Sequence, residues 1–257
     1  WWEARRPSRL WWTMEQNRNG IQAFARLSNL IYPRRCPICD GLTGSHKILA
    51  CGECRQRLVY VREPACKKCG KPLEKEETEY CADCGRRKHS YIRGKAVFPY
   101  DRLLRASVAR FKYRNRREYA DFYAEELIKS CGTALLSWEP DALIPIPLHK
   151  SRMRKRGFNQ AELVARRIGK SLGIPVETGL LFRAKRTSPQ KELSDAQRRS
   201  NLKNAFQVRK NDVKLRKIVL IDDIYTTGST IDAAAGVLLE HGAEKVYFLA
   251  ICIGRGF

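Results

Sequence analysis

Four Cys-x-x-Cys pairs at even spacing constrain this chain more than any other feature. The pairs begin at Cys36, Cys51, Cys66 and Cys81, and eleven residues separate each pair from the next. A Cys-x-x-Cys turn presents two thiolates to one tetrahedral ion, and a second turn completes a closed four-sulfur site. From Cys36 to about Ser90 there is little apolar sequence, so this segment must fold on its metals. The spacing therefore predicts two structural zinc sites.

The first and third pairs are both closely followed by glycine (CPICDG and CKKCG), which indicates a repeat unit holding two pairs. We therefore expect sequential pairing, with one zinc on Cys36, Cys39, Cys51 and Cys54 and another on Cys66, Cys69, Cys81 and Cys84. A cross-braced arrangement, in which the first pair joins the third, is the alternative. Iron–sulfur clusters or redox-active pairs are rival chemistries for the same spacing. Cys131 and Cys252 stand outside the repeat and are expected to be buried as small hydrophobic residues.

The overall composition describes a folded, strongly basic protein. The 257 residues are 43% hydrophobic, enough for one large or two modest domains. Lys and Arg number 50 against 27 Asp and Glu, a formal net charge of +23, which favours nucleic acid, a phosphorylated ligand or an acidic membrane surface as partner. No signal peptide pattern and no run of about 18 apolar residues is present. We expect a cytoplasmic protein with reduced thiols and no membrane insertion.

Composition and periodicity divide the chain into four segments. Residues 1–13 hold four of the five Trp, precede Met14, and are expected to be a non-native or disordered leader. Residues 14–35 predict a short amphipathic helix. Residues 36–90 form the expected double zinc ribbon. In residues 91–257 apolar runs alternate with helical periods, which is typical of a parallel α/β sheet with flanking helices.

The expected elements of this last segment are strands at 142–148, 217–221 and 245–253 and helices at 159–172 and 230–240. The continuous apolar run of residues 217–221 predicts a strand buried on both faces. Asn159 is the expected N-cap of its helix, with Glu162 as the acid of a capping box and Gly173 just past the end.

The segment IDDIYTTGST, residues 221–230, lies in a strand-to-helix turn at the carboxyl end of a central strand, where open α/β sheets bind ligands. Its backbone amides, hydroxyls and helix N-terminus predict a cradle for one phosphate group, formed by Thr226, Thr227, Gly228, Ser229 and Thr230. A carboxylate would repel a neighbouring phosphate. Carboxylates at this position must therefore contact sugar hydroxyls or a divalent cation. Asp222 and Asp223 therefore predict a phosphorylated ribose with magnesium, although acidic pairs also occur as helix caps or solvated turns.

This segment resembles the phosphoribosyl pyrophosphate (PRPP) binding motif of type I phosphoribosyltransferases. The stretches PIPL (145–148) and RGFNQA (156–161), together with Gln190, Leu193-Ser194, Arg198, Asn201 and Ala205-Phe206, are similar to the ComF family of competence proteins. The resemblance covers the chain from about residue 31 onward. It implies a type I phosphoribosyltransferase-like parallel sheet with flanking helices, preceded by a small zinc-ribbon module with four cysteines per site.

By this resemblance, Asp222 and Asp223 would bind the ribose hydroxyls and so position magnesium, while the 226–230 loop would hold the 5-phosphate. The turn after Leu148, with Lys150 and Arg152, is the expected pyrophosphate loop. In type I enzymes the protein mainly positions the substrates and neutralises the leaving pyrophosphate, so the two acids are also the candidate catalytic residues. The resemblance leaves turnover open, because the base-binding hood of nucleotide-making relatives has no clear counterpart here.

A basic stretch interleaved with aromatic residues predicts a contact with single-stranded DNA. Its candidate residues are Arg110, Lys112, Tyr113, Arg114, Arg116 and Arg117. The alternative is an amphipathic helix with Phe111 buried and a basic exposed side. A second basic cluster that begins at Arg183 is expected to lead into a mobile loop, residues 187–201, over the site. The resemblance implies a role in handling single-stranded DNA during natural transformation, with a competence helicase and recombination loader proteins as partners.

Overall fold

The computed structural model describes residues 33–45, 47–184, 205–209 and 214–254. The expected leader at 1–13, nearly all of the expected helix at 14–35 and the expected loop at 187–201 lie outside these ranges. Within them, no helix combines the length and apolar character needed to cross a membrane.

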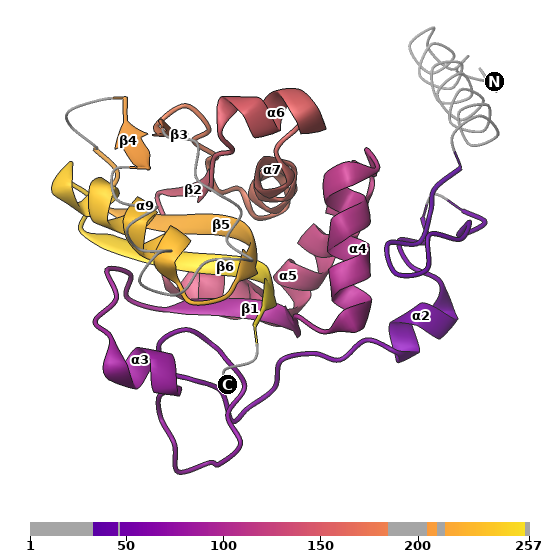
Figure 1. Ribbon diagram of the computed structural model, residues 1–257, viewed down its shortest axis with the longest axis horizontal. Coiled ribbons are helices and arrows are strands. Elements are labelled where there is room, and N and C mark those ends of the chain that lie inside the picture. Colours follow the sequence, from indigo (N-terminus) through magenta and orange to yellow (C-terminus); the bar gives the residue numbers. More distant parts are fainter. Residues whose placement is uncertain (1–32, 46, 185–204, 210–213, 255–257) are drawn as a thin grey trace, which may run out of the picture.

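A four-stranded parallel sheet forms the centre of the molecule (Figure 1). Its strands are β1 (Gly94–Pro99), β2 (Ala142–Pro145), β5 (Lys217–Tyr225) and β6 (Lys245–Ile253), in the order β1-β6-β5-β2. Every neighbouring pair is parallel. β5 and β6 are the inner strands, and their continuous apolar runs are buried on both faces, as parallel sheets require. The expected fold class is confirmed.

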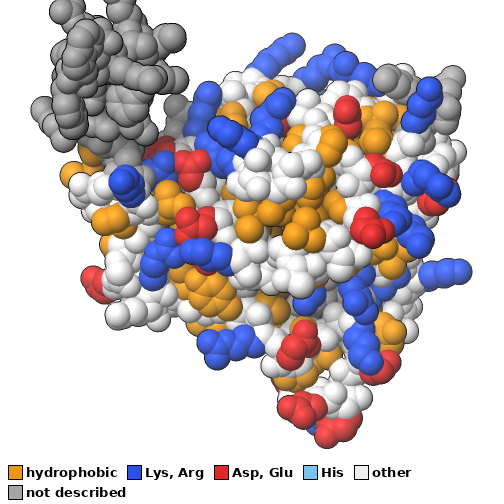
Figure 2. Space-filling model, turned by 180° about the vertical axis from the view of Figure 1, so that it is seen from behind, with side chains coloured by type: hydrophobic (Ala, Val, Ile, Leu, Met, Phe, Trp, Pro, Cys, Tyr) orange, Lys and Arg blue, Asp and Glu red, His pale blue; other side chains and the backbone are white. Residues whose placement is uncertain are grey.

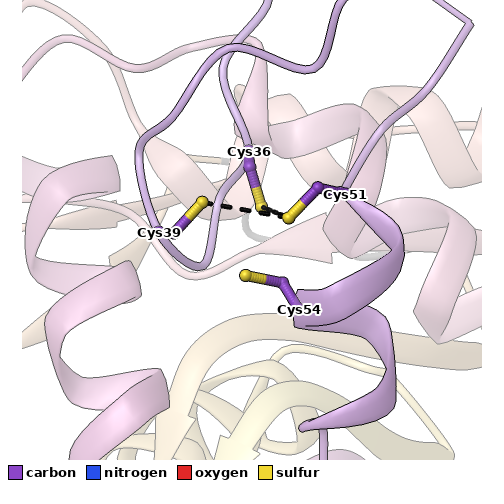
Figure 3. Close-up of side chains that lie close together, drawn as sticks. All are labelled: Cys36, Cys39, Cys51 and Cys54. Carbon is purple, nitrogen blue, oxygen red and sulfur yellow. Dashed lines mark hydrogen bonds between the residues drawn. The ribbon is translucent and has the colours of Figure 1, made fainter.

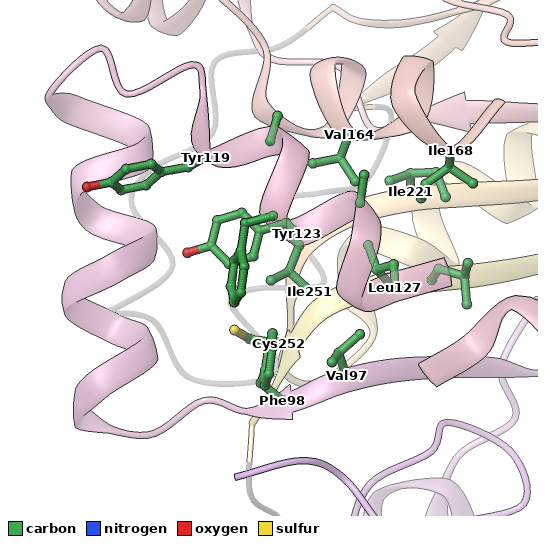
Figure 4. Packing of buried hydrophobic residues seen from close by; sticks show 14 of the residues in the cluster. Val97, Phe98, Tyr119, Tyr123, Leu127, Val164, Ile168, Ile221, Ile251 and Cys252 are labelled. Carbon is green, nitrogen blue, oxygen red and sulfur yellow. The ribbon is translucent and has the colours of Figure 1, made fainter. Parts of the chain in front are cut away.

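Helices cover both faces of this sheet. On one side lie α4 (Arg102–Tyr113), α5 (Tyr119–Ser137) and α7 (Gln160–Leu172), whose core includes Val219 and Ile221 (Figure 4). On the other side, α9 (Ser229–Glu240) packs on Ile218 and Leu220. The alternation along β5 follows from the two-residue period of a strand. The short antiparallel strands β3 (Leu181–Arg183) and β4 (Phe206–Val208) join the α9 side.

The local expectations are confirmed at α7 and extended at β5. The Asn159 side chain accepts a hydrogen bond from the Ala161 N–H, and Gly173 ends the helix in the left-handed region at φ 71°. The predicted capping box is wrong. The Glu162 side chain pairs with Arg166, one turn further along the helix, and does not turn back to the N-cap. β5 continues four residues past the expected 217–221, since its pairing with β6 continues as far as Tyr225.

The two zinc-ribbon segments pack into different halves of the core. The first ribbon (residues 36–54) ends within the short helix α2 (Gly52–Gln56), and its buried residues join the α4–α5–α7 core. The second ribbon (residues 66–84) ends within α3 (Ala82–Arg86), and its buried cysteines join the α9 core. Figure 1 shows α2 beside α4 and α3 beneath the sheet. Cys131 and Cys252 are buried at 3% and 0% exposure, as expected.

Candidate functional site

The turn between β5 and α9 has a backbone that only glycine suits at one position. Gly228 is the N-cap of α9 with φ 81°, and its carbonyl accepts the first helical hydrogen bond from the Asp232 N–H at 2.8 Å. A Cβ at this position would lie 2.6 Å from the Tyr225 hydroxyl. The hydroxyls of Thr227 and Ser229 meet at 2.9 Å beside it. Hydroxyls and N–H groups at a helix N-terminus favour an anion such as phosphate.

A cavity of about 240 Å³ opens at this end of the sheet. It is lined from α4, the β2–α7 connection, β3 and the end of β5. Its polar lining side chains are Tyr100, Lys112, Arg152, Arg156, Asn159, Arg183, Asp222, Asp223, Thr226 and Thr230. Cations and carboxylates therefore face the same space, a combination that suits a ligand carrying both phosphates and hydroxyls.

The two acids differ in their surroundings. Lys112 Nζ forms an ion pair with Asp223 Oδ1 at 2.7 Å. The side chain of Asp223 is 16% exposed and that of Lys112 is 15% exposed. Asp222 Oδ1 accepts a hydrogen bond from the Asp223 N–H at 2.8 Å. Burial, and then the negative charge of Asp223, raise the pKa of Asp222 to about 7. A hydroxyl donor or a cation at Asp222 would favour its ionised form.

Arg183 adds a desolvated positive charge to the cavity. It is 8% exposed and its guanidinium lies 5.2 Å from the centre of the Phe206 ring. Burial, and then the nearby charge of Arg152, lower the pKa of Arg183 to about 10. Two guanidinium groups held close together in this way would be stabilised by an anion, because the anion relieves both the repulsion and the desolvation.

Most of the predicted phosphoribosyl residues meet at this cavity. Asp222, Asp223, Thr226 and Thr230 line it, and the remaining loop residues form the turn beside it. Arg152 also lines it, whereas Lys150 is exposed at the start of α6 (Lys150–Arg156) and is not among the lining residues. The expected turn after Leu148 is short, because residues 150–156 form the helix α6, whose N-cap His149 accepts from the Ser151 N–H.

Sequence reasoning did not assign Lys112, Asn159 or Arg183 to this cavity, and it named Arg156 only as an extension of the expected pyrophosphate loop. Arg156 and Asn159 belong to the RGFNQA stretch, which supported the family resemblance, and that stretch was the available signal. Arg183 was placed only in a basic cluster. Lys112 is 111 residues away from Asp223 in the chain, and no local pattern connects them.

Three of the predicted nucleic-acid residues are committed elsewhere. Arg110 donates to the carbonyl oxygens of Pro37 and Ile38 in the first ribbon. Arg116 pairs with Asp40 at 3.0 Å, also in that ribbon. Lys112 lies in the cavity. These contacts give Arg110 and Lys112 of α4, and Arg116 just beyond it, partners within the chain.

The other three follow Lys112 in the chain, and two of them contact residues 156–158, which include the lining residue Arg156. Tyr113 is 63% exposed, and the Arg156 guanidinium stacks 4.9 Å from its ring centre while donating to its hydroxyl at 3.1 Å. Arg117 lies over the Phe158 ring and donates to the Gly157 carbonyl. Arg114 is exposed, whereas Phe111 is buried, as the amphipathic-helix alternative requires. On the rear face of the molecule, Lys and Arg are interspersed with acids instead of forming one patch (Figure 2).

The cysteines form two clusters with the geometry of zinc sites. Their sulfurs lie within 4.8 Å of one another in the groups Cys36, Cys39, Cys51, Cys54 and Cys66, Cys69, Cys81, Cys84. In the first cluster, Cys51 Sγ lies 3.8 Å from Cys36 Sγ and 3.9 Å from Cys39 Sγ (Figure 3). Tetrahedral coordination at Zn–S of about 2.3 Å requires sulfurs about 3.8 Å apart. The structure thus has the sequential pairing and not the cross-braced one, with all ten cysteines free of disulfides.

The segment that follows the second ribbon holds the first turn of α9. His89 Nδ1 lies 2.7 Å from Asp232 Oδ2, and the Ser90 N–H donates to Asp232 Oδ1 at 3.0 Å. The hydroxyls of Tyr91 and Tyr225 meet at 2.7 Å in the core beneath the turn. These contacts hold the β5–α9 turn from below.

Comparison with known proteins agrees with both halves of this architecture. A family model described as a double zinc ribbon domain matches residues 27–85, and one described as a phosphoribosyl transferase domain matches residues 120–255. Competence protein F of Haemophilus influenzae is 32% identical over 217 residues, which cover 82% of this chain and 93% of that protein.

Two further relatives carry related names. DNA utilization protein YhgH of Salmonella typhimurium is 32% identical, covering 87% of this chain and 98% of its own. Competence protein ComFC of Bacillus subtilis is 29% identical, covering 75% and 78%. Since the similarity extends over most of the chain and includes both domain types, the protein belongs to the ComF family, which joins a double zinc ribbon to a phosphoribosyltransferase domain.

Proposed function

We propose that this protein binds PRPP with magnesium in the cavity at the end of β5, binds single-stranded DNA, and helps to handle incoming DNA in natural transformation. The observation that carries the proposal is the meeting of Asp222, Asp223 and the 226–230 turn with a group of cations in one cavity. Relatives named for competence and for DNA utilization support the cellular role.

The chemistry of the cavity matches each part of this ligand. The carboxylates of Asp222 and Asp223 would accept from ribose hydroxyls, and the N-terminal turn of α9 would hold the 5-phosphate. Arg152, Arg156 and Arg183 would face the pyrophosphate. Magnesium prefers oxygen ligands such as carboxylate, hydroxyl and phosphate oxygens, so the donor set fits it. When bound, it would neutralise part of the pyrophosphate charge.

The DNA-binding part of the proposal rests on the exposed aromatic and basic groups that follow Lys112 in the chain. Tyr113 presents a ring that is 63% exposed, and Arg114 lies exposed beside it. Stacking on aromatic side chains combined with backbone cations is how sequence-tolerant proteins bind single strands. A protein with a formal net charge of +23 would bind a polyanion with steep salt dependence. In a cytoplasmic setting, its partners would be a competence helicase and recombination loader proteins.

Calorimetric titration of PRPP and magnesium into the zinc-loaded chain tests the ligand. We expect binding to wild type and its loss in the Asp222→Ala, Asp223→Ala variant, with both proteins folded by circular dichroism. A second titration with a single-stranded oligonucleotide, at two salt concentrations and with and without PRPP, tests the DNA component. Failure of wild type to bind PRPP under these conditions would refute the proposed ligand.

A second candidate function is phosphoribosyl transfer to an unidentified acceptor. The observation that favours it is the group of cations that faces the two acids, because neutralising a leaving pyrophosphate is the main electrostatic task of such a reaction. Magnesium-dependent release of pyrophosphate from PRPP measures it directly. Release that depends on both acids and on an added acceptor supports turnover, whereas binding without release with every acceptor tested leaves PRPP as a ligand only.

A further inference from the structure

We infer that Lys112 is a positioning residue of the phosphoribosyl site and that the first zinc ribbon holds it in place through α4. This inference rests on the proposed PRPP binding and extends it to a helix outside the β5–α9 motif. The first ribbon would therefore hold a residue of the phosphoribosyl site in position, in addition to supporting the fold.

The contact inside the cavity is specific. Lys112 Nζ lies 2.7 Å from Asp223 Oδ1, and both side chains are mostly withdrawn from water, at 15% and 16% exposure. An ion pair to one carboxylate oxygen fixes the rotation of the carboxylate. The other oxygen of Asp223 and the carboxylate of Asp222 are then oriented for ribose hydroxyls. In a desolvated cavity the ammonium also contributes more to the binding of an anionic ligand than it would in water.

The helix that carries Lys112 is held by the metal-binding turn of the first ribbon. Ser107 Oγ donates to the Pro37 carbonyl at 2.5 Å, and Arg110 Nη2 donates to the same oxygen at 3.2 Å and to the Ile38 carbonyl. Pro37 and Ile38 are the two residues between Cys36 and Cys39. The turn is therefore bonded to α4 on one side, and on the other its two cysteines would hold zinc.

A second attachment lies beyond Lys112 in the chain. Arg116 pairs with Asp40 at 3.0 Å, and the Tyr119 hydroxyl donates to the same carboxylate at 2.5 Å. Asp40 directly follows Cys39, so the ribbon contacts the chain on both sides of Lys112. The opposite side of α4 packs into the core through Leu104, Val108 and Phe111, among others. Held at two positions, the end of α4 has little freedom to move Lys112 away from Asp223.

The shape of a Cys-x-x-Cys turn depends on its metal, because such segments fold only as they bind the metal ion. Loss of the attachment between this turn and α4 should therefore release Lys112 and weaken PRPP binding. This release of Lys112 is specific to loss of the first ribbon. The segment that follows the second ribbon, residues 89–91, contacts α9 and the end of β5 instead of α4.

Calorimetric titration of PRPP and magnesium into the zinc-loaded full chain tests this. We expect Lys112→Met and Arg110→Met each to raise Kd by about tenfold, a change of about 1.4 kcal/mol. The double variant should bind no more weakly than the weaker of the two single variants, because both changes remove one interaction. Lys112→Arg should restore part of the affinity. Arg102→Met, on the exposed side at the start of the same helix, should bind like wild type.

A cooperative thermal unfolding transition shows that each variant is folded. If Arg110→Met does not fold, Ser107→Ala takes its place, because it also removes a hydrogen bond between α4 and the ribbon. Unchanged affinity in Lys112→Met, or additive losses in the double variant, overturns the inference while PRPP binding by wild type stands. If wild type does not bind PRPP, the proposed ligand is refuted and this inference is refuted with it.

Discussion

Gly228→Ala should destabilise the protein far more than alanine at another glycine with nearly the same backbone angle. A non-glycine residue in the left-handed region costs about 1–2 kcal/mol. Gly228 has φ 81° and Gly173 has φ 71°, so both variants incur this strain. At Gly173, however, an added Cβ meets nothing within 4 Å, whereas at Gly228 it would lie 2.6 Å from the Tyr225 hydroxyl.

Tyr225 cannot move aside at low cost. Its ring stacks on Phe248 at 4.6 Å, it is 2% exposed, and its hydroxyl is hydrogen-bonded to Tyr91 at 2.7 Å. Breaking that buried hydrogen bond costs about 1–3 kcal/mol. Gly228→Ala should therefore lower the free energy of unfolding by about 2–5 kcal/mol in total, as the two costs add.

Urea denaturation of both variants in the zinc-loaded state, with wild type as reference, measures the two free energies of unfolding. We expect Gly173→Ala to lose about 1–2 kcal/mol and Gly228→Ala to lose more. Equal losses in the two variants would show that the contact with Tyr225 carries no cost. The reasoning about the β5–α9 turn would then be refuted.

Three further predictions concern the same architecture. Removing zinc with a chelator should lower the melting temperature of the entire α/β domain, because buried residues of both ribbons belong to its two cores; a calorimetric transition that stays unchanged would contradict this. His89→Ala should lower the free energy of unfolding by about 1–3 kcal/mol and weaken PRPP binding, because Asp232 keeps only its bond from the Ser90 N–H. His241→Ala, at the far end of α9, should leave binding unchanged. Burial raises the pKa of Asp222 from 3.8, the value of a free aspartate, to about 7 in the folded chain. The unfolded chain therefore releases this proton at lower pH, and the ligand-free protein should lose stability as pH rises from about 4 to about 7. Asp222→Asn should remove that part of the pH dependence, as measured by urea denaturation across the range.

Local features of this protein were readable from the sequence. The Cys-x-x-Cys repeat indicated two four-sulfur sites, the 221–230 segment indicated a phosphate-binding turn with two acids, and Asn159 and Gly173 marked the ends of one helix. Each of these signals is carried by residues within a few positions of one another. Spacing, turn chemistry and capping therefore specify them without knowledge of the rest of the fold.

Other features required the packed structure. Short helices such as α6 follow from a single cap at His149, which the pattern did not reveal. The partition of the two ribbons between opposite faces of the sheet depends on which apolar residues they bury. Even spacing alone also allowed a cross-braced pair, although the glycine pattern favoured the sequential pairing that the structure has.

The sequence by itself thus determined two local features of this chain, namely the paired four-cysteine ribbons and a strand-to-helix turn that carries two acids. Tertiary structure alone decided which distant residues complete them. Lys112 reaches Asp223 across 111 residues because α4 is held between the core and the first ribbon. Arg183 reaches the same cavity from β3. Contacts of this kind depend on how helices pack on a sheet, and that packing is set by the burial of the entire chain and not by any short motif.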